Sequence, residues 1–115
     1  MLRFYAYKGC DGCRKARNWL NDHGIVFEEI PVRDQPPTVA ELRQAADQLG
    51  LKAIFNTSGM DYRQRGMKDK LPNMSEDEAL QELHTCGNLV KRPFLIGENI
   101  CLAGFKEDVW TEALS

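Results

Sequence analysis

The sequence predicts an α/β fold in which a β-α-β unit and a β-β-α unit flank an all-helical middle segment. Apolar runs with strand character occur towards the two ends of the chain, at residues 2–7, 25–30, 94–96 and 100–103. Helical patterns with polar caps fill most of the region between the second and third runs. Because the period of the apolar residues changes from two to that of a helix and back again, we expect one sheet with helices around it.

The N-terminal unit reads as strand, helix, strand. Residues 2–7 alternate in character and form the first expected strand. The helix that follows repeats its apolar side at Ala16, Trp19, Leu20 and His23. Gly24 is a natural C-terminal stop for this helix, and residues 25–30 read as a second strand that ends at Pro31.

A capping box opens the next predicted helix. Thr38 and Glu41 follow the Pro36-Pro37 pair, and their side chains can satisfy each other's free backbone donors. The buried side of this helix is expected at Leu42, Ala45, Ala46 and Leu49. Gly50 provides the stop.

The rest of the middle segment is more broken. Residues 55–72 are polar and contain two glycines, which predicts short helical pieces and loops. A second capping box, Ser75 to Glu78, opens a helix that ends before Gly87. The inward residues of this helix are Ala79, Leu80 and Leu83.

The C-terminal unit reads as a hairpin and a helix. Residues 94–96 and 100–103 are separated by only three residues, which implies an antiparallel connection. The closing helix is marked by Phe105, Val109, Trp110 and Ala113 or Leu114. This order is that of a thioredoxin-like fold with a helical insert at about residues 36–90, in a single domain spanning 1–115.

Composition narrows the class of protein. The chain has 115 residues, 43% apolar and 28% charged, with a formal net charge of -2. That charge provides no strong attraction to nucleic acid or to anionic lipid. No apolar run approaches the roughly 18 residues of a membrane span, and the N-terminus does not read as a secretory signal. We expect a cytoplasmic protein.

Cys10 and Cys13 form a CxxC at the first strand-to-helix junction. The N-terminus of a helix stabilises a thiolate, the form that attacks a disulfide or an oxyanion. Cys10 is therefore the candidate nucleophile, and Cys13 is either the resolving thiol or a small residue packed under the first turn. A zinc half-site is the other reading of a CxxC, and its further ligands would have to be His84 and Cys86. We expect no metal.

Three further residues are candidates for the same site. Arg14 follows the cysteine pair directly, so its charge favours a thiolate, whereas Lys15 and Arg17 fit a solvated basic face equally well. Pro93 precedes a strand, which fits a turn, a cis peptide or a plain strand entry. In a thioredoxin-like fold a proline at this point faces the CxxC. Arg92 would then point a cation, suited to a thiolate, sulfate or peptide carboxylate, at the same pocket.

The remaining cysteines and aromatic residues have simpler interpretations. Cys101 lies in an alternating strand, where a small core residue is the commoner reading. Cys86 follows a helix in a turn, and a third redox thiol is the alternative there. Tyr5, Tyr7 and Trp19 are interpreted as packing residues.

Three segments resemble one family. Residues 10–17 (Cys-Asp-Gly-Cys-Arg-Lys-Ala-Arg), 56–59 (Asn-Thr-Ser-Gly) and 91–93 (Lys-Arg-Pro) are similar to the arsenate reductase (ArsC)/Spx-related family of thioredoxin-fold proteins. The resemblance runs from end to end and includes residues 104–108. The CxxC places the chain closer to the Spx/MgsR-type branch.

The resemblance implies two different activities. Glutaredoxin-coupled arsenate reductases of the family attack arsenate with one cysteine and hold it with three arginines. Cys10 matches the nucleophile and Arg92 one arginine, but the other two arginine positions fall on Asn56 and near Gly104. Losing two cations disfavours arsenate reduction. Spx-type regulators use a CxxC as a redox switch and bind the C-terminal domain of the RNA polymerase α subunit.

The function expected from the sequence is that of a thiol-disulfide oxidoreductase with a Cys10/Cys13 redox pair. Arg14 and Arg92 would stabilise negative charge at sulfur, and Pro93 would shape the groove for the substrate. We expect no bound cofactor, with glutathione as reductant and a disulfide substrate, glutathione or glutaredoxin as partner. The alternative is a redox-sensing, Spx-like regulator that binds RNA polymerase, and arsenate reduction comes third.

Overall fold

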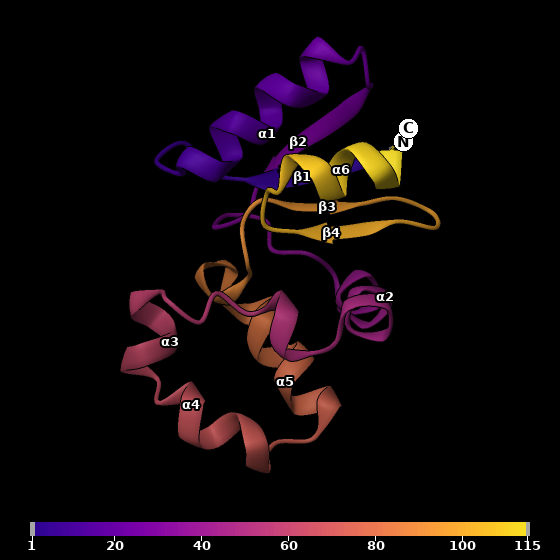
Figure 1. Cartoon of the computed structure of the whole chain (residues 1–115). Helices are drawn as coiled ribbons and strands as arrows, with labels where there is room; N and C mark the ends of the chain where they lie inside the picture. Colours follow the sequence, from indigo (N-terminus) through magenta and orange to yellow (C-terminus); the bar gives the residue numbers. More distant parts are fainter. Residues whose placement is uncertain (1, 115) are drawn as a thin grey trace.

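The computed structural model describes residues 2–114 and contains one mixed four-stranded sheet (Figure 1). Its strands, in the spatial order β2-β1-β3-β4, are β1 (Leu2–Ala6), β2 (Phe27–Pro31), β3 (Phe94–Ile96) and β4 (Cys101–Ala103). β1 and β2 are parallel, whereas β1–β3 and β3–β4 are antiparallel. The predicted α/β fold, with its β-α-β and β-β-α units, is confirmed.

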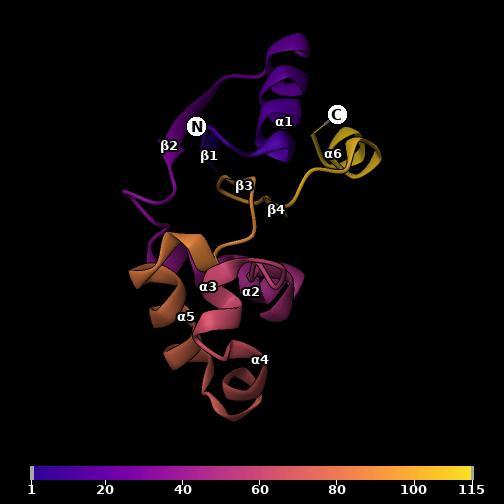
Figure 2. The same cartoon turned by 90° about the vertical axis from the view of Figure 1, so that its left-hand side faces the viewer.

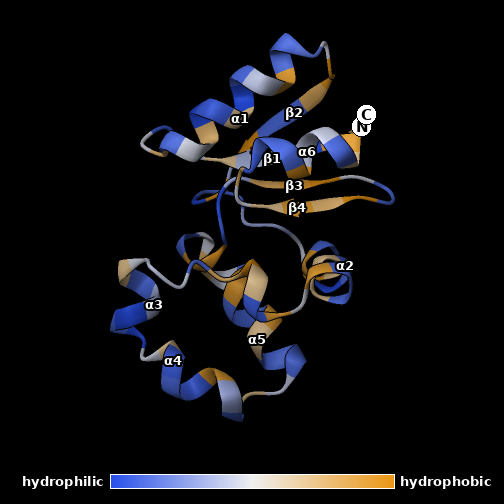
Figure 3. Ribbon diagram, viewed as in Figure 1, coloured by the Kyte–Doolittle hydropathy of each residue, from blue (hydrophilic) through white to orange (hydrophobic). Residues whose placement is uncertain are grey.

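Helices cover both faces of the sheet. Figure 2 shows α1 (Asp11–Asp22) and α6 (Glu107–Leu114) on one side, and α2 (Val39–Leu49) and α5 (Glu76–Thr85) on the other. Side chains alternate along β1, so Phe4 joins the apolar cluster under α1 and α6 while Tyr5 joins the cluster beneath α2 and α5. Strands enclosed in this way should be apolar throughout, and β3 and β4 are largely hydrophobic in Figure 3.

The segment between β2 and β3 contains only helices, loops and one isolated antiparallel bridge, between Phe55 and Val90. Besides α2 and α5 it contains α3 (Met60–Gln64), α4 (Met67–Lys70) and the 3-10 turns η1 (Lys52–Ile54), η2 (Leu71–Asn73) and η3 (Gly87–Leu89). Both predicted capping boxes are present, at Thr38 and at Ser75. The short helical pieces predicted between residues 55 and 72 are α3, α4 and the start of η2.

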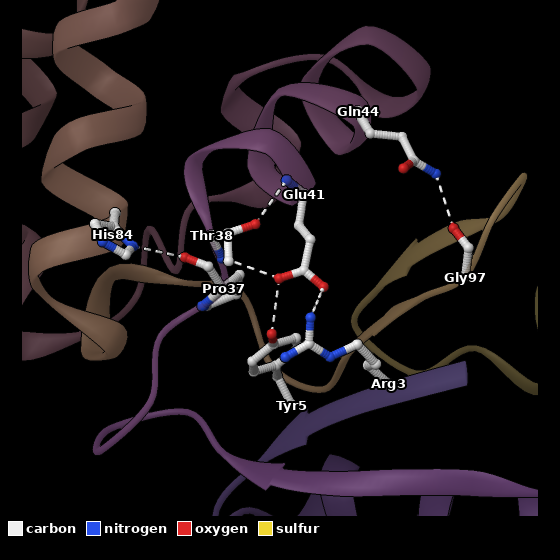
Figure 4. A network of polar contacts seen from close by, with 8 residues as sticks. All are labelled: Arg3, Tyr5, Pro37, Thr38, Glu41, Gln44, His84 and Gly97. Atoms are coloured by element: carbon white, nitrogen blue, oxygen red, sulfur yellow. Dashed lines mark hydrogen bonds and ion pairs between the residues drawn. The ribbon is translucent and has the colours of Figure 1, made fainter. Parts of the chain in front are cut away.

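A polar network joins this helical segment to the sheet (Figure 4). The Glu41 carboxylate accepts hydrogen bonds from Tyr5 Oη at 2.7 Å and from Arg3 Nη1 at 2.8 Å. The same carboxylate completes the capping box by accepting the Thr38 N–H at 2.9 Å. One side chain therefore caps α2 and holds it to β1.

The predicted start of the second strand is wrong, and Phe105 lies before the closing helix that it was expected to mark. β2 begins at Phe27 rather than at residue 25, because the Ile25 N–H still donates to Leu20 O at the end of α1 (3.0 Å), and Val26 is 72% exposed. In α6 only Trp110 is buried, whereas Val109 is 45% exposed. Within residues 2–114, the helices are too short or too polar for any of them to span a membrane.

Candidate redox site

Cys10 caps the N-terminus of α1 with its sulfur. Its backbone is extended (φ -100°, ψ 116°), and its Sγ accepts the N–H of Cys13 at 3.1 Å. The sulfur thus takes the place that a serine or aspartate oxygen holds in an ordinary N-cap. A negative charge on this atom faces the free donors and the positive end of the helix dipole.

Cys13 lies directly beneath and is fully buried, whereas Cys10 is half-buried. Both thiols are free. Burial, followed by the hydrogen bond with Cys10, raises the pKa of the Cys13 thiol well above its usual range. Cys13 also belongs to the apolar cluster of Phe4 and Ala16. The pair therefore consists of one reachable sulfur and one shielded, protonated thiol.

Pro93 lies beside the CxxC. The Arg92–Pro93 peptide bond is cis. A Cβ built on Gly12 would lie 3.5 Å from Pro93 Cδ and 3.9 Å from Cys10 Sγ, so both atoms border the same point above Gly12. Pro93 O in turn accepts the N–H of Gly104 at 2.8 Å. The structure thus brings together Cys10 and Pro93, as the order of elements predicts.

Arg92 is half-buried and directed to the loop that precedes Cys10. Its Cζ lies 4.5 Å from the centroid of the Tyr7 ring, and its Nη1 donates to Asn88 Oδ1 at 3.4 Å. Burial dominates the raised pKa of Cys13, and the charge of Arg92 acts in the opposite direction. This guanidinium is therefore within electrostatic reach of Cys13.

Arg14 and Arg17 are both directed to carboxylates. Arg14 is 61% exposed and pairs with Asp11 Oδ1 at 3.4 Å on the outer side of α1. Arg17 forms two hydrogen bonds of 2.7 Å to the carboxylate of Glu29, which raise the pKa of the guanidinium and join α1 to β2. Neither contact involves a thiol.

Tyr7, interpreted from the sequence as a packing residue, has a more specific environment. Arg33 Cζ lies 3.8 Å from its ring centroid, and Arg92 is its second cationic neighbour. The ring also lies over Gly9, where a Cβ would approach Tyr7 Oη to 3.0 Å. The parallel pairing of β1 with β2 could have indicated that Tyr7 and Arg33 lie close together, because the carboxyl ends of parallel strands meet at one edge of the sheet.

A groove of about 540 Å³ opens at this edge. It is lined by Ala6, Tyr7, Lys8, Glu29, Pro31, Arg33 and Asp34. Tyr7 O accepts the N–H of Cys10 (3.4 Å), so the groove begins within one turn of the half-buried Cys10. Two of its lining residues, Lys8 and Arg33, are cationic, and Tyr7 is aromatic.

The other two cysteines lie away from the pair in the fold. Cys86 ends α5, and its Sγ lies 3.8 Å from Asp61 Oδ1. Cys101 is buried in β4, where burial raises its pKa to about 11. Residues 2–114 contain no group of three or more histidine, cysteine or acidic side chains placed to hold a metal. His84 Nδ1 donates instead to Pro37 O at 2.9 Å.

The two positions where the family resemblance leads one to expect arginines provide no cation of their own. Asn56 uses its backbone N–H for a 2.7 Å bond to Leu89 O. Gly104 has a φ of +76°, and the stem of Lys91 passes over it, with Cε 3.1 Å from where a Cβ would lie. Of the three positions where the resemblance leads one to expect an arginine, Arg92 alone holds one.

Comparisons with known proteins identify the family of the chain. The model of the ArsC family matches residues 5–113. The chain is 46% identical to the YusI protein of Bacillus subtilis, over 96% of each chain. It is 33% identical to the global transcriptional regulator Spx of Enterococcus faecalis, over 94% of this chain and 82% of that one.

Solved structures show the same fold. An ArsC family related protein from Bacteroides fragilis superimposes with a TM-score of 0.90 at 38% identity, over 97% of this chain and 96% of the other. Similarity in sequence and in structure thus extends over nearly the whole length. The chain belongs to the ArsC family and has its thioredoxin-like fold, with relatives among the Spx regulators.

Proposed function

We propose that the protein is a thiol-disulfide oxidoreductase in which Cys10 attacks and Cys13 resolves. The main support is the difference between the two sulfurs: Cys10 Sγ is reachable and accepts an N–H at the start of α1, whereas the Cys13 thiol is buried beneath it. A nucleophile must reach a substrate, and a resolving thiol needs to reach only the nucleophile.

The first step is an exchange at the substrate disulfide. The Cys10 thiolate attacks one sulfur of R–S–S–R′, so a bond forms between Cys10 Sγ and that sulfur. The substrate S–S bond breaks, and R′S⁻ leaves with the electron pair and takes a proton from water. The donors at the start of α1 stabilise the thiolate before the attack. Pro93 limits the approach on the side of Gly12.

The second step releases the product. Cys13 loses its proton and attacks Cys10 Sγ, which forms the Cys10–Cys13 disulfide and expels RS⁻. The substrate has then gained two electrons and the dithiol has lost two. Two molecules of a small thiol, for which we propose glutathione, restore the dithiol and become one oxidised disulfide.

Arg92 and Arg14 have unequal parts in this proposal. Arg92 is half-buried, and its charge favours ionisation of the Cys13 thiol, the group that must attack in the second step. Arg14 contributes from an exposed position where Asp11 neutralises it, so solvent and salt screen its effect. Arsenate reduction remains disfavoured, because Asn56 and Gly104 leave one of three cations.

Substitution of single cysteines by serine tests the proposal. Cys10→Ser should abolish reduction of a mixed disulfide between glutathione and a small thiol. Cys13→Ser should instead trap glutathione on Cys10, visible by mass spectrometry. Cys86→Ser is the matched control and should keep normal turnover. Full turnover by the Cys10→Ser protein would refute the assignment.

A redox-sensing regulator is the second candidate. It is favoured by the similarity to the Spx proteins over 94% of this chain. Formation of the Cys10–Cys13 disulfide would then change a surface that binds RNA polymerase through its α subunit. Pull-down of RNA polymerase with reduced and with oxidised protein separates the candidates, since equal absence of binding in both states excludes the regulator.

A further inference from the structure

The Tyr7 ring has two guanidinium neighbours beside the cysteine loop. Arg33 Cζ lies 3.8 Å and Arg92 Cζ 4.5 Å from its centroid, both within the range of a cation–π contact. The two arginines come from distant parts of the chain, one after β2 and one before β3. The ring therefore gathers two positive charges at one place.

A close backbone crossing brings these arginines together. A Cβ on Gly87 would overlap Val32 O and lie 3.1 Å from Arg33 Cα. Only a glycine allows η3 to approach the loop after β2 so closely. Because Asn88 follows Gly87 directly and Arg92, five residues after Gly87, donates to Asn88 Oδ1, this crossing carries Arg92 to the same ring as Arg33.

The charges at this place have no acidic partner in the described chain. The arginines that form ion pairs with carboxylates in residues 2–114 are Arg3, Arg14, Arg17, Arg43 and Arg65. Those ion pairs include neither Arg33 nor Arg92, nor the neighbouring Lys8. Of the acids lining the groove, Glu29 is bound to Arg17, and Asp34 is exposed.

We propose that Tyr7, Arg33 and Arg92 form a carboxylate-binding subsite that selects disulfides with a carboxylate close to the sulfur bound by Cys10. The inference rests on the proposed function and specifies its substrate class. A guanidinium binds a carboxylate through two parallel hydrogen bonds, and the flat Tyr7 ring keeps both guanidiniums oriented. The adjoining groove, with Lys8 at its edge, accommodates the rest of such a substrate.

A binding measurement tests the subsite without turnover. The probes are S-methylglutathione and its dicarboxamide, titrated into the Cys10→Ser protein by calorimetry. We expect the dicarboxylate to bind at least about tenfold more tightly, the ratio produced by 1.4 kcal/mol. Arg33→Gln should reduce this ratio to near one, and Arg43→Gln, which alters an arginine on the distant α2, should preserve it. Equal affinity of both probes, or an unchanged ratio in Arg33→Gln, would overturn the proposal.

A turnover measurement separates the two proposals and the two sources of carboxylate. Two series of substrates are compared. The first consists of mixed disulfides of glutathione and of its dicarboxamide. The second consists of mixed disulfides of short peptides whose cysteine is flanked by glutamates or by glutamines. A preference for the acidic form in either series supports the subsite. A preference in the glutathione series identifies a small thiol as the source of the carboxylate, and a preference in the peptide series identifies a protein segment. Turnover without preference in both series overturns the subsite alone. Binding preference without any turnover refutes the oxidoreductase and retains the subsite.

Discussion

The backbone N–H of Cys13 donates a hydrogen bond to the sulfur of Cys10 at 3.1 Å, while the thiol of Cys13 is itself fully buried. Cys13 therefore contacts the more accessible sulfur of Cys10 through its main chain and holds its own buried sulfur beneath it. The two thiols consequently differ in access and in the cost of ionisation.

Resolution of a mixed disulfide on Cys10 should accelerate with pH. Burial raises the pKa of Cys13, so only a small fraction of this thiol is ionised near neutral pH. That fraction, and with it the rate, grows roughly tenfold per pH unit below the pKa. Stopped-flow release of a coloured thiol from the Cys10 adduct between pH 7 and 9 measures the slope. A flat profile would show that ionisation of Cys13 does not limit release.

The reduced protein should lose stability in alkaline solution. The folded pKa of Cys13 lies above the unfolded value of roughly 8.5, so its contribution is complete below that value. It declines as pH rises through the interval up to the folded pKa, because the unfolded chain ionises first. Cys101 adds a change of the same sign, since its pKa is raised to about 11.

Urea unfolding at pH 7 and at pH 10 measures this effect. The double variant Cys13→Ala/Cys101→Ala should show a smaller decrease between the two pH values than the reduced parent protein. Exchange of the less buried Cys86 is the control and should leave the decrease as it is. An equal decrease in the double variant would assign the alkaline loss to other groups.

Gly87→Ala should be strongly destabilising. The new methyl group would overlap Val32 O, a backbone atom that cannot move aside without shifting the loop after β2. We expect a loss of about 3 kcal/mol, at the upper end of the usual cost of overpacking. Gly24→Ala is the matched control: its φ is +65°, but nothing lies within 4 Å, so backbone strain alone should cost roughly 1–2 kcal/mol. Chemical unfolding compares the two variants.

Glu41→Ala should loosen the attachment of α2 to the sheet. The change removes the acceptor of the Arg3 and Tyr5 bonds and half of the capping box (Figure 4). A hydrogen bond to a charged group contributes about 1.5–3 kcal/mol, so loss of the two side-chain bonds is expected to cost at least about 3 kcal/mol. Tyr5→Phe should lose less, because the ion pair to Arg3 remains. Similar losses in both variants would place the main contribution at the tyrosine hydroxyl.

Local patterns explain what the sequence could predict. The CxxC junction, the two capping boxes and the hairpin at residues 94–103 are each specified by neighbouring residues. Val26 and Val109 are apolar without being buried, and apolar periodicity cannot separate such residues from core positions.

The environment of Tyr7 depends on contacts between distant segments. It requires the parallel pairing of β1 with β2 and also the crossing at Gly87. At this crossing Gly87 lies against Val32, 55 positions earlier in the chain. A single sequence does not reveal such a crossing. The pairing of Arg14 with Asp11 is local by contrast, at three residues' separation on one helix, and could have been expected.

Arg92 and Arg14 should differ in their effect on resolution by Cys13. The charge of Arg92 opposes the burial that raises the pKa of Cys13, so Arg92→Gln should raise that pKa further and slow release from the Cys10 adduct severalfold at pH 8. Arg14→Gln should change the rate by less than about twofold, because Asp11 and solvent screen an exposed guanidinium. Added salt provides the internal check: the half-buried Arg92 should retain most of its effect at high ionic strength, and any effect of Arg14 should vanish. Equal slowing by both variants would show that the net charge of the surface, rather than the position of Arg92, governs the ionisation of Cys13.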